Sequence, residues 1–148
     1  MNTINQNKPP LLYLHKLNDI RVALENILHD VADCSFEEFS ENKMLRQSVM
    51  YEMHIVSTSS RFLLHILDDA DEDQKNWLES QFGDIPFKAL VILREMFFHE
   101  GENCRASNAE NYRPVWNMYQ YDLPAIKSQL DQVYATVSKK YTSLRRKD

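Results

Sequence analysis

Apolar residues recur at steps of three and four along most of this chain, which is the period of one face of an α-helix. Three long runs follow the pattern, over residues 11–33, from Asn42 to an acidic segment at 68–73, and from about residue 124 to the basic end at 145–147. The repeating positions are Leu14, Leu17, Ile20, Leu24, Ile27 and Val31 in the first run, Leu45, Val49, Met53, Val56, Leu63 and Leu67 in the second, and Ile126, Leu130, Val133, Val137 and Leu144 in the last. We predict a long amphipathic helix for each run.

Capping residues lie between the first two runs. Ser35 and Glu38 have the spacing of a capping box, which predicts a short helical turn through Phe36 and Phe39. Asn42 then stands where the N-cap of the second long helix is expected.

A shorter helix is expected after the second long run. The acidic segment 68–73 offers N-caps for it, and Gly83 marks its end. We expect Trp77 and Phe82 to anchor this helix on the core.

Another main helix is predicted after Pro86, which sits where a first-turn proline belongs. Residues 87–100 contain no helix breaker, and Gly101 occupies the position just past the expected helix end. A polar loop follows. Residues 112–121 again have a helical pattern, and the segment 122–124, Asp-Leu-Pro, predicts a kink or restart before the last helix.

Together these elements predict an all-α fold, an antiparallel bundle of four main helices with short additional helices. Residues 11–145 are expected to form one domain, because 148 residues suit a single core and no linker or repeat interrupts them. The polar residues 1–10 are expected to form a disordered or extended tail.

Composition narrows the function classes. The chain has two glycines, where about ten are usual for its length, so it carries neither a GxGxxG fingerprint nor a P-loop. Cys34 and Cys104 lie 70 positions apart without a CxxC pair, so we expect no zinc knuckle and no disulfide framework. No cofactor is therefore expected, and a reducing compartment fits.

Neither a targeting segment nor a membrane span is visible. The longest aliphatic stretch, residues 89–93, is far too short to cross a bilayer, and we expect a cytoplasmic protein. There are 17 basic and 22 acidic side chains, which gives a formal net charge of −5. Because binding to phosphates needs clustered Lys and Arg, this charge argues against a general nucleic-acid binder. Any contact with RNA must be local.

The residues of chemical interest gather on the predicted helix over residues 87–100. Lys88, Glu95 and His99 form one narrow polar stripe, whereas apolar side chains cover the rest, so nearly the whole helix should be buried. Arg94 falls on the apolar side, where an unpaired guanidinium would be costly. Arg94 must therefore pair with a carboxylate of another helix or face a cleft. A surface pair with Glu95 is an alternative role for His99.

The segment Arg94-Glu-Met-Phe-Phe-His99 has an R-x4-H spacing near a predicted helix end. Further blocks accompany it in order, namely SFEEFSENKMLRQSVMYEMHIV at residues 35–56, Ile85-Pro86-Phe87, Val115-Trp116, and Asp122-Leu123-Pro124-Ala-Ile-Lys127. With these blocks, residues 15–135 resemble the HepT branch of the HEPN superfamily of helical domains.

The resemblance implies metal-independent cleavage of RNA by a homodimer. It implies that Arg94 stabilises charge on the phosphoryl oxygens and that His99 moves protons while an RNA 2′-hydroxyl attacks the adjacent phosphorus. On one helix these two side chains point about 140° apart, so one helix does not aim both at one atom. The resemblance implies that dimerisation brings the motif helices of two chains together in a shared cleft. No metal-ligand set is apparent. The nearest candidate is His65 with Asp68 and Asp69, and these residues are better explained as the solvated end of a helix.

The family also implies a partner, a minimal nucleotidyltransferase antitoxin that silences the toxin by attaching nucleotides to the tyrosine of an R-x4-H-x-Y motif. Gly101 stands at that position here, and Glu95 replaces a small polar residue. These departures leave open a non-catalytic alternative, a HEPN-fold binding module that pairs with a nucleotidyltransferase. Tyr112, Tyr119 and Tyr121 are either substitute acceptors or ordinary packing residues.

Overall fold

The computed structural model describes residues 11–83, 85–97 and 112–146, and every regular element within them is a helix. The elements are α1 (Leu11–Ala32), α2 (Phe36–Glu41), α3 (Lys43–Asp69), α4 (Glu72–Phe82), α5 (Phe87–Val91), α6 (Leu93–Phe97), α7 (Arg113–Asn117), the π-helical turn η4 (Met118–Asp122) and α8 (Leu123–Arg146). The predicted all-α helical bundle is confirmed. Expectations for the 1–10 tail, His99, Gly101 and Cys104 fall outside the described residues.

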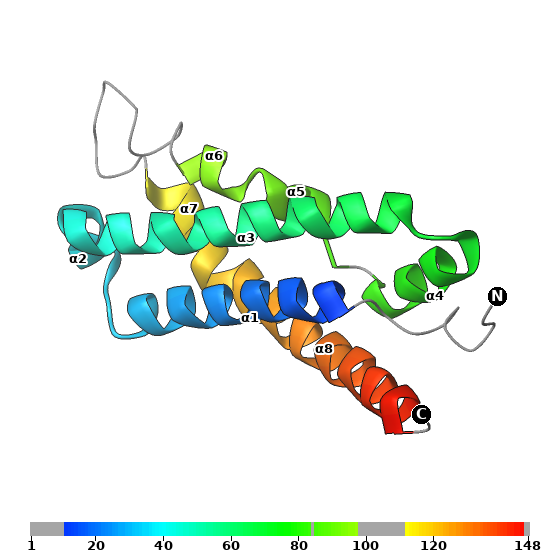
Figure 1. Ribbon diagram of the computed structural model, residues 1–148. Coiled ribbons are helices and arrows are strands. Elements are labelled where there is room, and N and C mark those ends of the chain that lie inside the picture. Colours follow the sequence, from blue (N-terminus) through cyan, green and yellow to red (C-terminus); the bar gives the residue numbers. More distant parts are fainter. Residues whose placement is uncertain (1–10, 84, 98–111, 147–148) are drawn as a thin grey trace.

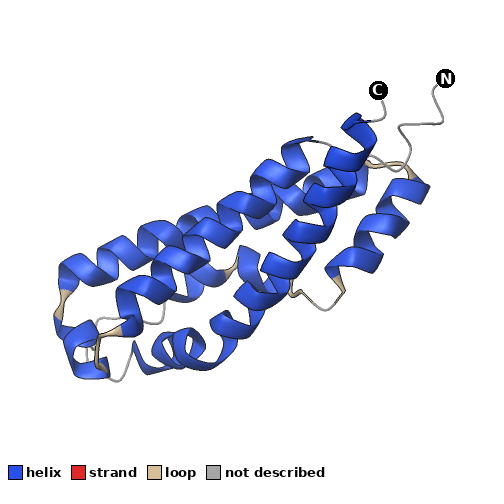
Figure 2. Cartoon of the chain, turned by 90° about the horizontal axis from the view of Figure 1, so that it is seen from below, coloured by secondary structure: helices blue, strands red, loops and turns tan. Residues whose placement is uncertain are grey.

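The helices form a bundle in which successive long segments run in opposite directions. Figure 1 shows α1 and α3 side by side and antiparallel, with α5 and α6 following α3 on its other side. The last helix, α8, lies obliquely against α1, and α4 contacts α8. Short described loops join α1 to α2, α2 to α3 and α3 to α4, as the view in Figure 2 shows.

The core lies where the predicted apolar faces meet. In α1 all six predicted positions are buried, and in α3 all but the half-buried Leu45 are buried. The largest fully buried side chains come from α1 to α5 and from η4, and they are Tyr13, Tyr119, Phe39, Leu17, Ile20, Leu24, Ile27, Met53, Leu63, Leu78 and Leu90. Apolar periodicity therefore identifies the buried faces of α1 and α3.

The predicted N-caps form as expected. Ser35 Oγ accepts a hydrogen bond from the Glu38 N–H at 3.1 Å, and Asn42 Oδ1 accepts one from the Leu45 N–H at 3.0 Å. Within the acidic segment, Asp71 is the N-cap of α4 and accepts from the backbone N–H three residues later at 2.8 Å. These bonds satisfy N–H groups that the first turn of a helix leaves without partners.

The anchors of α4 differ in part from the prediction. Phe82 is buried as expected, but Leu78, and not Trp77, is the second buried side chain of this helix. Trp77 is half-buried, and Lys140 Nζ lies 3.8 Å from the centroid of its ring. Because an indole is large and amphipathic, it covers the side of the core under a cation while the smaller leucine fills the interior.

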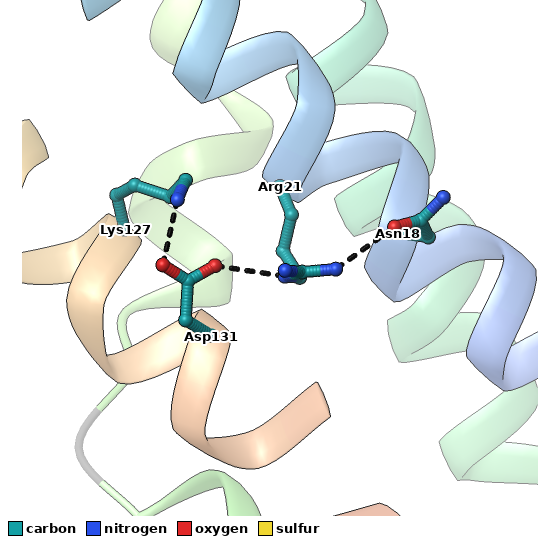
Figure 3. A network of polar contacts seen from close by, with 4 residues as sticks. All are labelled: Asn18, Arg21, Lys127 and Asp131. Atoms are coloured by element: carbon teal, nitrogen blue, oxygen red, sulfur yellow. Dashed lines mark hydrogen bonds and ion pairs between the residues drawn. The ribbon is translucent and has the colours of Figure 1, made fainter. Parts of the chain in front are cut away.

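A polar network joins α1 to α8. Asp131 accepts from Arg21 Nε at 2.8 Å and from Lys127 Nζ at 2.6 Å, and Arg21 also donates to Asn18 at 2.9 Å (Figure 3). Partial burial acts to raise the pKa of Asp131, but the hydrogen bonds from Lys127 and Arg21 outweigh it and lower that pKa. The paired carboxylate thus helps to fix α8 against α1.

The chain is helical from residue 113 to residue 146, with one irregular turn. The kink or restart was expected at residues 122–124, but the irregular turn is the π-helical η4 at 118–122, and the helix continues through Leu123 and Pro124 into α8. Pro124 has no N–H to donate, and a wider turn just before it is one way in which a helix accommodates a proline. Leu123, beside it, is fully buried and holds the junction on the core.

Candidate functional site

The segment predicted as one helix over residues 87–100 is interrupted at Ile92, where a hydroxyl group from α3 lies at the break. Ile92 has φ −94° and ψ 4°, and its N–H bonds to the carbonyl three residues earlier at 3.2 Å, which closes α5. The Ser57 hydroxyl donates to the Leu90 carbonyl at 3.1 Å and accepts from the Arg94 N–H at 3.2 Å. In an uninterrupted α-helix these two backbone groups would bond to each other. The continuous helix is therefore a wrong prediction, and the inserted hydroxyl accounts for the break.

Arg94 follows this break and lines a groove between α3 and α6 with a volume of about 280 Å³. The other lining residues are Gln47, Met50, Tyr51 and His54, all on α3. Arg94 is half-buried, whereas Tyr51 and His54 are exposed. In such a groove the arginine can contact a phosphate. The neighbouring phenol or imidazole ring can contact a base of the same nucleotide.

The α5–α6 segment is less buried than predicted. Phe87, Leu90 and Leu93 are buried, but Ala89 is exposed and Ile92 exposes 47% of its surface. The reason is that α3 covers one side of the segment only. Its other side borders an open groove of about 460 Å³, which is lined mainly by apolar side chains of α5–α6 and of η4–α8.

The second residue of the predicted catalytic pair, His99, lies outside the described residues. Glu95, directly after Arg94, is exposed on α6, and Lys88 is exposed on α5. The structure therefore describes the part of the site that is formed by Arg94 and by side chains of α3.

The three tyrosines considered as substitute acceptors differ in access. Tyr119 is buried, its hydroxyl lies 3.1 Å from Met53 Sδ, and burial raises its pKa. Tyr112 is also buried and packs edge-on against Phe39. Tyr121 is 76% exposed. The first two are packing residues, and only the last has an accessible hydroxyl.

The described part of the chain carries neither a metal-binding cluster nor a membrane-spanning helix. His65, Asp68 and Asp69 are exposed near the end of α3, and no group of three or more His, Cys, Asp or Glu residues in the described ranges is arranged to hold a metal ion. No described helix combines the length and the apolar character needed to cross a membrane.

Sequence reasoning gave no positive role to the α3 residues that build this site. Tyr51, His54 and Ser57 meet Arg94 only after α6 has packed on α3, so no local pattern connects them. One signal was available, since Ser57, Ser59 and Ser60 place several hydroxyls on the buried side of an amphipathic helix. Buried polar groups of this kind need partners.

Comparison with known proteins adds three archaeal relatives, all from Methanocaldococcus jannaschii. The protein named "Putative RNase MJ1380" is 25% identical over 117 residues, which cover 79% of this chain and 92% of that protein. "Putative RNase MJ0125" is 23% identical over 124 residues, 84% of this chain and 92% of its own length. "Putative RNase MJ1216" is 22% identical over 124 residues, 84% and 88% of the two chains. No family model and no solved structure matches the chain.

Proposed function

We propose that this chain is a HepT-like, metal-independent endoribonuclease in which Arg94 and His99 are the catalytic residues. The observation that carries the proposal is the placement of the Arg94 guanidinium beside the α3–α6 groove. The near full-length similarity to three proteins named "Putative RNase" supports RNA as the substrate. A half-buried arginine that lines an open groove suits the binding of a phosphate.

The proposed reaction is an internal transesterification. The RNA 2′-oxygen forms a bond to the adjacent phosphorus, and the bond from phosphorus to the 5′-oxygen of the next nucleotide breaks. The products are a 2′,3′-cyclic phosphate and a 5′-hydroxyl. His99 moves the proton, because an imidazole titrates near neutral pH, and Arg94 stabilises the charge that develops on the phosphoryl oxygens.

The proposed active form is a homodimer. Five residues separate Arg94 from His99, so one regular helix cannot aim both side chains at one phosphate, whereas two copies can pair the arginine of one with the histidine of the other. Support comes from the exposed Ile92 and from the apolar groove between α5–α6 and η4–α8, a surface that a second chain would cover. Light scattering on the purified protein measures this directly, and a single-chain mass would refute the pairing.

We also propose that the protein is the toxin of a cytoplasmic toxin–antitoxin pair whose partner is a minimal nucleotidyltransferase. Because Gly101 replaces the usual acceptor tyrosine, silencing by nucleotide transfer would need another hydroxyl. Tyr121 is exposed in the single chain, but it lines the apolar groove that the proposed dimer covers, so it would accept a nucleotide before the dimer forms. Incubating the protein with such an enzyme and labelled nucleotide, with Tyr121→Phe as the control, tests this role.

The proposed reaction is tested with RNA in which the attacking 2′-hydroxyl at one position is missing. A short RNA and a matched strand with a single 2′-deoxynucleotide at the cleaved position are incubated with the purified protein. We expect the RNA to yield a 2′,3′-cyclic phosphate and the deoxy strand to remain intact at that position. Equal cleavage of both strands would contradict the proposed chemistry.

The alternative, a non-catalytic binding module, is favoured by the exposed carboxylate of Glu95, which directly follows Arg94 and would repel phosphate if it faced the same groove. A protein that cleaves no RNA and is harmless when overproduced, yet still binds a nucleotidyltransferase, would establish this alternative.

Ser57 gives a prediction about how Arg94 is positioned. Replacing Ser57 by alanine removes the hydroxyl between Leu90 and Arg94, so a direct helical bond can form and shift the guanidinium. We expect RNA cleavage to slow by roughly 10- to 100-fold, since displacements of about 1 Å have such effects. Ser60→Ala is the matched control, because Ser60 Oγ is buried without a hydrogen-bond partner in the described part of the chain. Equal rates for Ser57→Ala and wild type would contradict the positioning role.

A further inference from the structure

One flank of α3 carries a line of exposed side chains. Its members recur at steps of four and three, and they are Gln47, Tyr51, His54, Thr58, Arg61 and His65, which we call the α3 flank. This spacing places them on one side of the helix, and all six are exposed. At about 1.5 Å per residue the flank is about 27 Å long.

The charge of the α3 flank differs from that of the whole chain. None of its six members is acidic, although the chain carries a net charge of −5. Between residues 43 and 67 the one acidic residue is Glu52, whose Oε1 accepts from Asn26 of α1 at 3.3 Å and so lies on the other side of α3. From Gln47 to Arg61 the flank therefore has no neighbouring carboxylate of its own helix, whereas Asp68 and Asp69 lie one turn beyond His65 at the end of α3. The carboxylate-free part, which holds His54 and Arg61, suits a polyanion.

The α3 flank also leads directly to Arg94. Gln47, Tyr51 and His54 line the same groove as the Arg94 side chain. Tyr51 is 65% exposed, so its side chain is accessible to a planar ligand. An exposed aromatic ring beside cations is the arrangement with which proteins bind single-stranded nucleic acid, because bases stack on the ring while the cations contact the backbone.

We propose that the α3 flank binds the single-stranded RNA segment adjoining the scissile phosphate, with one base stacked on Tyr51. His54 and Arg61 contact the backbone phosphates of this segment. The inference rests on the proposed function, since it extends the substrate path from Arg94 along α3. It adds a binding site for unpaired RNA and a residue, Tyr51, that holds a base.

The test measures binding separately from cleavage. A fluorescein-labelled oligoribonucleotide in which every 2′-hydroxyl is methylated cannot undergo the proposed reaction, and its affinity is read by fluorescence anisotropy. We expect Tyr51→Ala to weaken binding by about 5- to 100-fold and Tyr51→Phe to retain it, because stacking needs the ring and not the hydroxyl. Arg61→Gln should reduce the slope of log K against log salt concentration by about 1.

Phe62→Ala is the matched control. Phe62 is another exposed aromatic residue of α3, but Lys16 of α1 lies 5.1 Å from its ring centroid, so it belongs to a different contact. Its removal should leave the affinity for the oligonucleotide unchanged.

The outcomes separate this proposal from the proposed catalysis. Tyr51-dependent binding by a protein that cleaves no RNA would uphold the α3 flank and refute the nuclease. Cleavage of RNA with wild-type affinity in Tyr51→Ala would refute the flank and leave the nuclease standing. Absence of any binding by the wild type, or equal competition by a poly-glutamate peptide of the same charge, would also overturn the flank proposal.

Discussion

Replacing Arg94 by alanine is expected to reduce RNA cleavage by about 10²- to 10³-fold, the usual cost of removing one group that stabilises transition-state charge. The guanidinium lies at the groove between α3 and α6, and Arg94→Ala removes it while the backbone bond from the Arg94 N–H to Ser57 remains available. The fold should therefore be kept. The rate constant for cleavage at saturating RNA is the quantity to measure.

Arg94→Lys is the informative companion variant. Lysine keeps the charge but not the planar, forked donors, so we expect an intermediate rate. Circular dichroism and thermal unfolding of each variant show whether the bundle is intact. A fully folded Arg94→Ala protein that cleaves RNA at the wild-type rate would remove Arg94 from the mechanism.

The second large effect is expected on the stability of the fold, when a buried aromatic ring is removed. Replacing Phe39 by alanine is expected to lower the free energy of unfolding by about 3–5 kcal/mol, because a fully buried aromatic ring is lost and a cavity remains. The Phe39 ring centroid lies 6.1 Å from that of Tyr112, 5.4 Å from that of Trp116 and 5.6 Å from that of Tyr119. The ring therefore joins α2 to the segment that leads into α8.

Urea unfolding, followed by circular dichroism, measures this loss. Phe62→Ala serves as the control, since that side chain is 41% exposed and its truncation should cost much less. A loss below about 1 kcal/mol for Phe39→Ala would mean that the aromatic cluster does not hold α7 and η4 on the bundle.

The elements that local sequence controls were predicted well. The caps at Ser35 and Asn42 and the apolar faces of α1 and α3 agree with the structure, because each depends on residues within one or two turns. The break at Ile92 was not predicted. No proline or glycine marks it, and the hydroxyl responsible belongs to Ser57, more than thirty positions earlier.

The candidate site, too, was predictable from the sequence only in part. The R-x4-H spacing singled out Arg94, whose exceptional feature is a charge within an apolar segment. The groove beside it could not be predicted, because Tyr51 and His54 look like ordinary exposed residues of α3 until α6 is packed against them. His99 lies outside the described residues, and its role stays a prediction.

Cleavage of RNA by the purified wild-type protein and by the Arg94→Ala, His99→Ala double variant, each with and without EDTA, tests the central claim most directly. We expect wild-type cleavage to survive EDTA and the double variant, intact as a dimer, to cleave no RNA. Cleavage that EDTA abolishes, or that the double variant retains, would contradict a metal-independent ribonuclease built on these two residues.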